Sequence, residues 1–178
     1  MKRFILSLAL WFFASLANAG MTLSAVAVPP SQVYEAAKNE QLFSFPEKKE
    51  KDGNAVYLDK AWHGIHYLLT GSAFESKSVL GHAIMGGRAI GKDKGYGPMR
   101  LLSPEQVKAI AEALSKITPE QLSARYDARA MAKADIYPDI WVDEGPGALK
   151  YLLSFYGPLQ SFYKQAAKNG HAVLLVIA

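Results

Sequence analysis

The chain contains no cysteine. Disulfide bonds, thiolate metal sites and a lipid anchor on cysteine are therefore excluded, and core packing alone must hold the fold together. Low-complexity tracts are also absent, and half of the residues are hydrophobic while 20% are charged. In a chain of 178 residues, this composition predicts one globular domain rather than a disordered protein.

The N-terminus lacks a hydrophobic run long enough to cross a bilayer. Its apolar stretch, residues 4–16, is shorter than the roughly 18 residues that a spanning helix needs. Lys2 and Arg3 precede this stretch, and the small-residue sequence Ala17-Asn18-Ala19 follows it. This order is typical of a secretory signal peptide, and it is favoured over a transmembrane anchor. We expect cleavage after Ala19 and a mature domain of residues 20–178 in the periplasm or outside the cell, without a stable membrane anchor.

The chain also lacks a strong excess of charge. The formal net charge is +4, and loss of Lys2 and Arg3 with the signal peptide would leave 4 − 2 = +2. The remaining basic residues are spread along the chain, so nucleic acid is not an expected partner. Residues 86–93 match the phosphate-binding pattern G-x-x-x-x-G-K-[ST] except at its last position, where Asp93 replaces the hydroxyl that binds Mg²⁺. We therefore expect no nucleotide and no other cofactor.

The stretch from Leu58 to Gly71 shows the clearest helical pattern. Its apolar residues recur at helical spacing and form one arc that would face the core. Asp59, His63 and His66 fall on a narrow neighbouring arc beside Trp62, because spacings of three and four bring side chains together on a helix. The pattern predicts a helix with two histidines at the edge of the core, ended by Gly71.

Strands are predicted at both ends of the mature chain, with helices between them. Residues 21–28 and 172–178 are apolar runs, and the second lacks alternation, as expected of a strand buried on both faces. Capping boxes at Ser103 and Thr118 start two helices, and a helical face continues from Ala148, with a kink or break expected near Gly157 because Pro158 lies inside it. The glycine-rich residues 81–98 show no helical period. We predict a single α+β domain whose mixed sheet includes both terminal strands.

Several motifs together resemble the YfbM-like family, the bacterial domain of unknown function 1877. The resemblance rests on residues 58–63 and 66–71, on residues 95–100, on Tyr126-Asp127, and on residues 136–138 with Trp141. Phe162-Tyr163 and residues 166–170 fit as well. The resemblance implies a small mixed α/β fold over nearly all of the mature chain and implies no reaction.

Candidate site residues cluster on the predicted central helix. His63, His66 and Asp59 have a spacing that suits a metal site, but H-E-x-x-H and cysteine pairs are missing, so we favour histidines hydrogen-bonded within the fold and predict no metal. A catalytic hypothesis uses His63 or His66 as general base, Asp59 or Asp127 to orient it and Arg100 to hold an anion. No nucleophile elbow accompanies them. The candidate binding residues are mainly aromatic: Trp62, Tyr96, Arg100, Tyr126, Asp127, Tyr137 and Trp141.

Two hypotheses for the function follow. The first is an exported, non-enzymatic protein-binding module, specifically an immunity-type inhibitor of a toxin that acts in the cell envelope. It draws on the small size, the export signal, the incomplete catalytic constellation and the number of aromatic residues. The alternative is a small hydrolase or transferase that uses Asp59, His63, His66 and Arg100.

Overall fold

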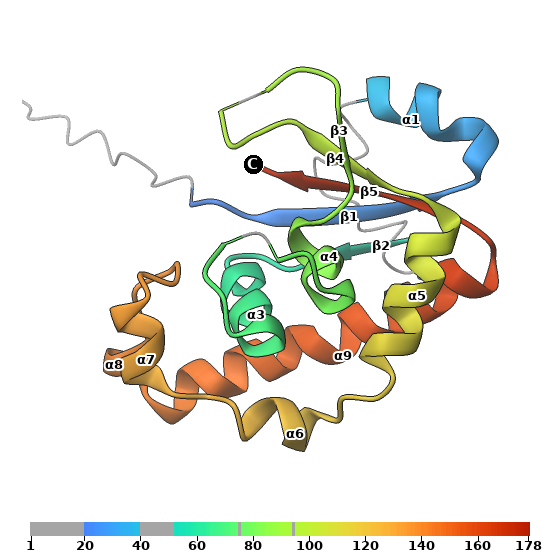
Figure 1. Cartoon of the computed structure of the whole chain (residues 1–178). Coiled ribbons are helices and arrows are strands. Elements are labelled where there is room, and N and C mark those ends of the chain that lie inside the picture. The colour runs from blue at the N-terminus through green and yellow to red at the C-terminus, as the bar shows by residue number, and fades with distance from the viewer. Residues whose placement is uncertain (1–19, 40–51, 75, 94) are drawn as a thin grey trace, which may run out of the picture.

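A computed structural model describes residues 20–39, 52–74, 76–93 and 95–178 (Figure 1). The predicted signal peptide lies outside the described residues. The described strands form one five-stranded sheet in the order β2-β1-β5-β4-β3. They comprise β1 (Leu23–Val28), β2 (Ala55–Tyr57), β3 (Arg88–Ile90), β4 (Met99–Leu102) and β5 (Ala172–Ile177). All four pairings are antiparallel, which corrects the expectation of a mixed sheet.

The two terminal strands share one sheet, as the sequence predicted, and they lie side by side in its middle. β1 pairs with β5 from Leu23 opposite Ile177 to Val28 opposite Ala172. All six residues of β1 and the first four of β5 are buried. Their continuous apolar runs are explained by this position, because both faces of the two strands are covered by other residues. The α+β class and the single domain are confirmed.

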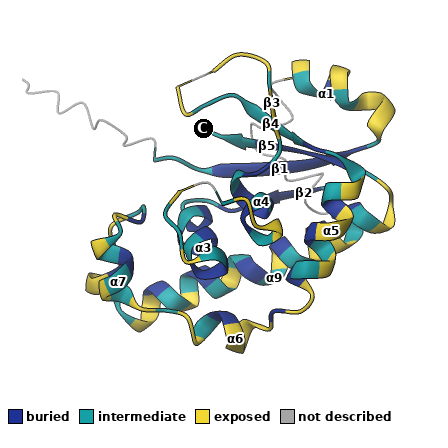
Figure 2. Cartoon of the chain, in the orientation of Figure 1, coloured by how far each residue is buried: buried dark blue, intermediate teal, exposed yellow. Residues whose placement is uncertain are grey.

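Four helices cover one face of the sheet (Figures 1 and 2). They are α3 (Ala61–Thr70), α4 (Val79–Met85), α5 (Pro104–Leu114) and α9 (Pro146–Lys168). Their apolar sides pack with Leu23, Ala25 and Leu175 of the sheet in the larger core cluster. The opposite face carries a smaller cluster around Val26 and Leu174, onto which Ala36 packs. Ala36 belongs to α1 (Val33–Lys38), which follows the short 3-10 helix η1 (Pro30–Gln32).

Three short helices form the end of the molecule away from the sheet. They are α6 (Pro119–Ser123), α7 (Ala128–Lys133) and α8 (Trp141–Glu144), and α7 and α8 lie beside the start of α9 in Figure 1. Both predicted capping boxes are present: Ser103 accepts from Gln106 N–H, and Thr118 accepts from Gln121 N–H. Among the described residues, no helix is long and apolar enough to cross a membrane.

Two sequence-based expectations were wrong, those for the start of the central helix and for residues 79–85, and of the kink or break expected near Gly157 the break does not occur. The central helix begins at Ala61, and Asp59 precedes it with a positive φ of 45°. Residues 79–85 form α4, and Ser78 caps the start of this helix. Gly81 lies inside it because a Cβ at this position would collide with Ser76. α9 continues through Pro158 without a break. Buried residues on both sides of the proline, including Tyr156 and Leu159, hold the two halves against one core.

Candidate functional site

The two histidines of α3 are held by the backbone. His66 is fully buried, and its Nε2 donates to the carbonyl oxygen of Phe74 at 2.8 Å. His63 Nδ1 accepts from the N–H of Tyr137 at 3.0 Å, so its Nε2 carries the proton and donates to the carbonyl oxygen of Ala73 at 2.8 Å. Burial lowers the pKa of both imidazoles and so favours their neutral form, which the accepting Nδ1 of His63 requires.

These bonds fix the short loop after α3, residues 71–74, which we call the Phe74 loop. Gly71 ends the helix in the left-handed conformation, as predicted. Ser72 Oγ accepts from the N–H of Phe74 at 3.1 Å and lies 3.2 Å from its carbonyl oxygen. Both backbone polar groups of Phe74 are therefore held, yet the residue is 79% exposed. The fold presents a large aromatic residue to solvent from a backbone whose N–H and carbonyl groups are both hydrogen-bonded.

Asp59 is engaged by tyrosines. Tyr151 donates its hydroxyl proton to Asp59 Oδ2 at 2.8 Å, and Tyr57 donates to Oδ1 at 3.4 Å. Burial, followed by the contact with Asp59, raises the pKa of Tyr151. Because the histidines bond backbone groups instead, the structure does not assemble the predicted relay of carboxylate and imidazole. In the part of the chain that the structure describes, no three His, Asp or Glu residues come together as a metal site.

The predicted binding aromatics are distributed between the core and its edges. Trp141 is fully buried, and its indole N–H donates to the carbonyl oxygen of Ile136. Trp62 is 5% exposed, stacks on His63 at 4.9 Å between ring centroids and donates to the carbonyl oxygen of Met21. The Tyr126 hydroxyl lies 3.1 Å from the carbonyl oxygen of Trp141. These aromatic side chains join separate segments of the chain to one another.

Asp127 and Tyr137 also hold local structure. Asp127 Oδ1 caps α7 by accepting from the N–H groups of Arg129 and Ala130, both at 3.0 Å. Tyr137 precedes a cis peptide bond to Pro138, and its own N–H is the group that His63 accepts from. Asp127 therefore does not orient either histidine through these bonds.

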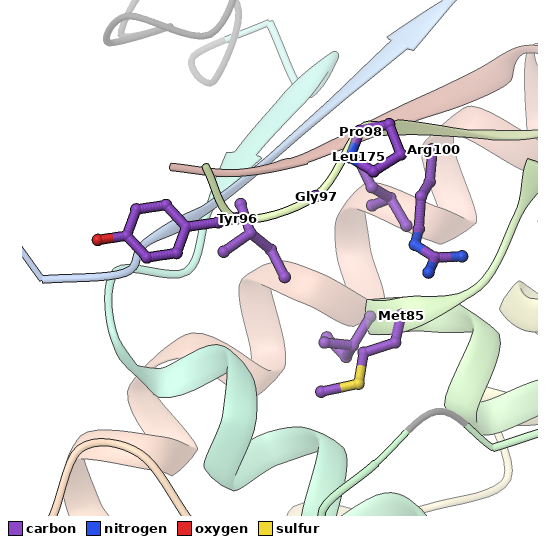
Figure 3. A pocket seen from close by; sticks show the side chains of 8 residues that line it. Met85, Tyr96, Gly97, Pro98, Arg100 and Leu175 are labelled. Atoms are coloured by element: carbon purple, nitrogen blue, oxygen red, sulfur yellow. The ribbon is translucent and has the colours of Figure 1, made fainter. Parts of the chain in front are cut away.

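Arg100 and Tyr96 both line a cleft between β4 and α4, and Figure 3 shows the Tyr96 ring pointing away from Arg100. Two adjoining cavities of about 150 and 220 Å³ meet here, and Met85 and Arg100 line both of them. The smaller cavity has apolar walls formed by Ile84, Met85, Tyr96, Pro98, Leu175 and Ile177. The larger cavity is more polar and is lined by Ser76, Lys77, His82, Gly86, Gly87 and Arg100.

Local backbone geometry builds the walls of this cleft. Asp93 Oδ1 accepts from the N–H groups of Gly95 and Gly97, at 2.7 and 3.0 Å, and so shapes the turn that carries the half-exposed Tyr96. Gly87 has a φ of 93°, and a Cβ there would lie 2.7 Å from the carbonyl oxygen of Leu101. Only glycine allows β3 to start this close to β4, because a side chain would meet both strain and a collision.

The sequence pointed to Tyr96 and Arg100 but missed the other walls of the cleft. Met85, Leu175 and Ile177 come from a helix that was not predicted and from a strand at the far end of the chain. The four-residue β4 was also missed, because its sequence Met-Arg-Leu-Leu shows no apolar/polar alternation. The side of the sheet on which Arg100 lies follows from its pairing with Leu175, which the local sequence does not reveal.

The architecture defines a small α+β domain in which the first and last strands pair at the centre of one antiparallel sheet. The chain belongs to the family described as Domain of unknown function (DUF1877), whose model matches residues 20–176. It is similar in fold to the crystal structure of YfbM, a protein of unknown function from Escherichia coli. The TM-score is 0.64 at 18% identity, covering 88% of this chain and 99% of that chain. No curated protein matches the chain.

Proposed function

We propose that this protein is an exported, non-enzymatic protein-binding module, and that it acts as an immunity-type inhibitor of a toxin in the cell envelope. Export is supported by the signal-peptide pattern in residues 1–19. The family match begins at residue 20, directly after the expected cleavage position. A domain that starts there would reach the periplasm or the exterior intact.

The Phe74 loop is the observation that carries the binding role. Aromatic side chains dominate the energetics of protein interfaces, and a fixed backbone reduces the entropy lost on binding. Phe74 combines both properties, because the residue is 79% exposed while His66 and Ser72 hold its backbone. Val79, at the start of α4, is 44% exposed and adds apolar surface a few residues further along the chain.

The hydrolase or transferase alternative has less support. His63 uses both ring nitrogens within the fold, and His66 is fully buried. A general base needs a nitrogen that can reach the proton it removes. His63 would have to give up a structural bond to provide one, and the Nδ1 of His66, which bonds no described group, is buried away from solvent. Asp59 bonds Tyr57 and Tyr151, so it does not activate either histidine.

Affinity capture from the envelope fraction of the source bacterium tests the proposal. The purified protein is expected to retain a specific envelope protein encoded next to its own gene, and to neutralise that protein's toxicity when the two are produced together. Phe74→Ala is expected to weaken binding at least tenfold, because loss of an interface aromatic anchor costs about 2 kcal/mol or more.

Tyr34→Ala is the matched control for Phe74→Ala. Tyr34 is similarly exposed at 70%, but it lies on α1 over the opposite face of the sheet. Its loss is expected to leave capture unchanged. The proposal is overturned if the purified protein retains no envelope protein, or if Phe74→Ala and Tyr34→Ala bind the partner equally well. Turnover that disappears in a His63→Ala variant with intact partner binding would favour the enzyme alternative instead.

A further inference from the structure

A groove between α5 and α9 is an additional feature that the proposed interface does not use. Its volume is about 620 Å³. Ala111 and Ala167 line the groove and pack against the main core cluster, and their short side chains leave the space above them open. Gln160 braces the two helices, because its Nε2 donates to the carbonyl oxygens of Leu114 and Ile117 at 2.9 and 3.0 Å. The two walls of the groove are therefore joined by hydrogen bonds as well as by the core.

The groove carries an excess of positive charge. Three exposed lysines line it: Lys108, Lys164 and Lys168. Glu112 is the one acidic residue of the described lining, which gives a charge of 3 − 1 = +2, and no lysine of the groove forms an ion pair with a described carboxylate. Lys164 and Lys168 are four residues apart on one helix, a spacing at which like charges repel. The dipole at the end of α9 explains Lys168 in its last turn but not Lys108 in the first half of α5. A negatively charged partner would relieve the repulsion.

The other end of α9 carries the opposite charge. Residues 134–149 contain four carboxylates and no lysine or arginine. Trp141, the first residue of α8, is fully buried, whereas Val142 beside it is 55% exposed. Three exposed acidic residues lie next to Val142, and none of them forms an ion pair with a described cation: Asp139, Asp143 and Glu144. We call Val142 and these three residues the acidic end, which joins one apolar side chain to several negative charges.

One molecule cannot bring the groove and the acidic end together. Figure 1 shows α8 and α5 at opposite ends of α9. α9 begins at Pro146, and the groove lies along its residues 160–168. Because a helix rises about 1.5 Å per residue, at least roughly 20 Å of helix separates the two surfaces. A contact between them therefore needs two copies of the chain. Such a head-to-tail contact leaves one groove and one acidic end open, so further copies can add to it.

We propose that the acidic end of one copy docks in the groove between α5 and α9 of a second copy, so that the protein associates head to tail. Val142 then lies on Ala111 and Ala167, and the carboxylates of the acidic end stand opposite the lysines of the groove. A flat anionic surface such as a membrane would meet the lysines but leave the groove unfilled. One groove and one short helix make a small interface, so we expect a dissociation constant on the order of 0.1 mM. The Phe74 loop belongs to neither surface, so this proposal does not rest on the proposed function.

Sedimentation equilibrium of the purified protein tests this association. Between about 10 µM and 1 mM protein, a range that brackets the expected dissociation constant, the weight-average mass is expected to rise above that of the monomer. Association is expected to weaken at least fivefold when the salt concentration is raised from about 20 to 300 mM, because salt screens exposed charges. Amide NMR shifts that change on dilution are expected to be confined to α8, α5 and the second half of α9, which would locate the contact.

Charge reversal gives a second test. Lys164→Glu in the groove and Asp143→Lys in the acidic end are each expected to weaken self-association at least tenfold, because each brings like charges into contact. Both positions are exposed, so folding is not at risk. An equimolar mixture of the two variants is expected to associate again, since the unchanged acidic end of the first meets the unchanged groove of the second. Arg88→Glu on β3 and Glu35→Lys on α1 are the matched controls, because they change the net charge equally at exposed positions outside both surfaces.

Three results would overturn the proposal. The first is a protein that stays monomeric up to about 1 mM at low salt, well above the expected dissociation constant. If its groove residues then shift only when the captured envelope partner is added, the groove belongs to that partner instead of a second copy. The second is an effect of Arg88→Glu as large as that of Lys164→Glu. The third is a mixture of Lys164→Glu and Asp143→Lys that remains monomeric. None of these results concerns Phe74, so the effect of Phe74→Ala on capture remains a separate test of the proposed function.

Discussion

At the scale of single residues, the histidines of α3 act as donors to the backbone. The sequence placed His63 and His66 at the edge of the core and favoured hydrogen bonds within the fold. It did not identify the acceptors, the carbonyl oxygens of Ala73 and Phe74. Those acceptors lie beyond the end of the helix, so their position depends on the path of the loop rather than on helical periodicity. The spacing of two histidines on one helix face therefore could not separate a metal site from a pair of loop anchors.

The histidines should make stability depend on pH. Burial lowers the pKa of both imidazoles in the folded protein. Below the ordinary histidine pKa of about 6.5, the unfolded chain binds more protons than the folded one, so the free energy of unfolding falls as pH decreases. We expect a loss of less than about 1.4 kcal/mol per pH unit for each imidazole between about pH 6.5 and 5, and a smaller loss for the partly exposed His63. Urea unfolding at a series of pH values measures this slope.

A double variant, His63→Gln/His66→Gln, is the control for the pH prediction. Glutamine keeps an N–H donor for the loop carbonyls but does not titrate. Its free energy of unfolding is expected to change less than that of the native protein over the same pH range, which isolates the histidines from the carboxyl groups. An unchanged slope in the double variant would show that other groups cause the pH dependence.

At the scale of helices and strands, the local sequence correctly predicted the helices that begin with a capping box. The capping boxes at Ser103 and Thr118 gave the starts of α5 and α6 correctly, because a cap depends only on residues within one turn. α4 was missed although Ser78 is a local N-cap, because its glycines suggested turns. The reason for Gly81 is tertiary: α4 packs against α3 and α5, and only glycine fits beside Ser76. β3 was missed because three residues show too little alternation to be read as a strand.

The caps should contribute measurably to stability. Ser103→Ala leaves the N–H of Gln106 without its side-chain acceptor, and Thr118→Ala does the same to Gln121. Each change is expected to lower the free energy of unfolding by about 1 kcal/mol, which corresponds to a melting temperature about 2–4 °C lower in a domain of this size. Ser161→Ala, at an exposed position inside α9, is expected to shift stability by less than about 0.5 kcal/mol. Thermal unfolding in which all three variants behave alike would contradict the assigned caps.

At the scale of the whole molecule, both ends of the described domain are built into its centre. The buried runs at residues 21–28 and 172–178 were sufficient to predict that the terminal strands share a sheet. The order of the five strands was not predictable, because it depends on contacts between segments up to about 150 residues apart, such as Leu23 with Ile177. The cleft beside Arg100 depends on the same long-range pairing, since Leu175 and Ile177 form part of its wall. Its chemistry therefore could not be read from local motifs.

The start of the domain gives a prediction about the expected cleavage. Leu23 is fully buried, the indole of Trp62 donates to the carbonyl oxygen of Met21, and Thr22 and Ala178 exchange two backbone hydrogen bonds. A chain beginning at Gly20 keeps these contacts and is expected to match the full-length chain in free energy of unfolding. A chain beginning at Ser24 loses them all, and burial of one leucine with three hydrogen bonds is worth about 3–6 kcal/mol. That is a large share of the 5–15 kcal/mol typical of a folded domain.

Urea unfolding of the three chains measures the difference, and the intact mass of the protein recovered from the periplasm or medium shows where the natural chain begins. We expect a mass that corresponds to a start at Gly20. Processing at Ser24 or beyond would remove a buried strand residue and the contacts of Trp62 and Ala178, so a stable natural chain with that start would contradict the role given to residues 20–23. A natural chain that keeps residues 1–19 would instead contradict the expected cleavage after Ala19. It would not affect the predicted contribution of residues 20–23 to stability, because the unfolding of the Gly20 chain is measured independently.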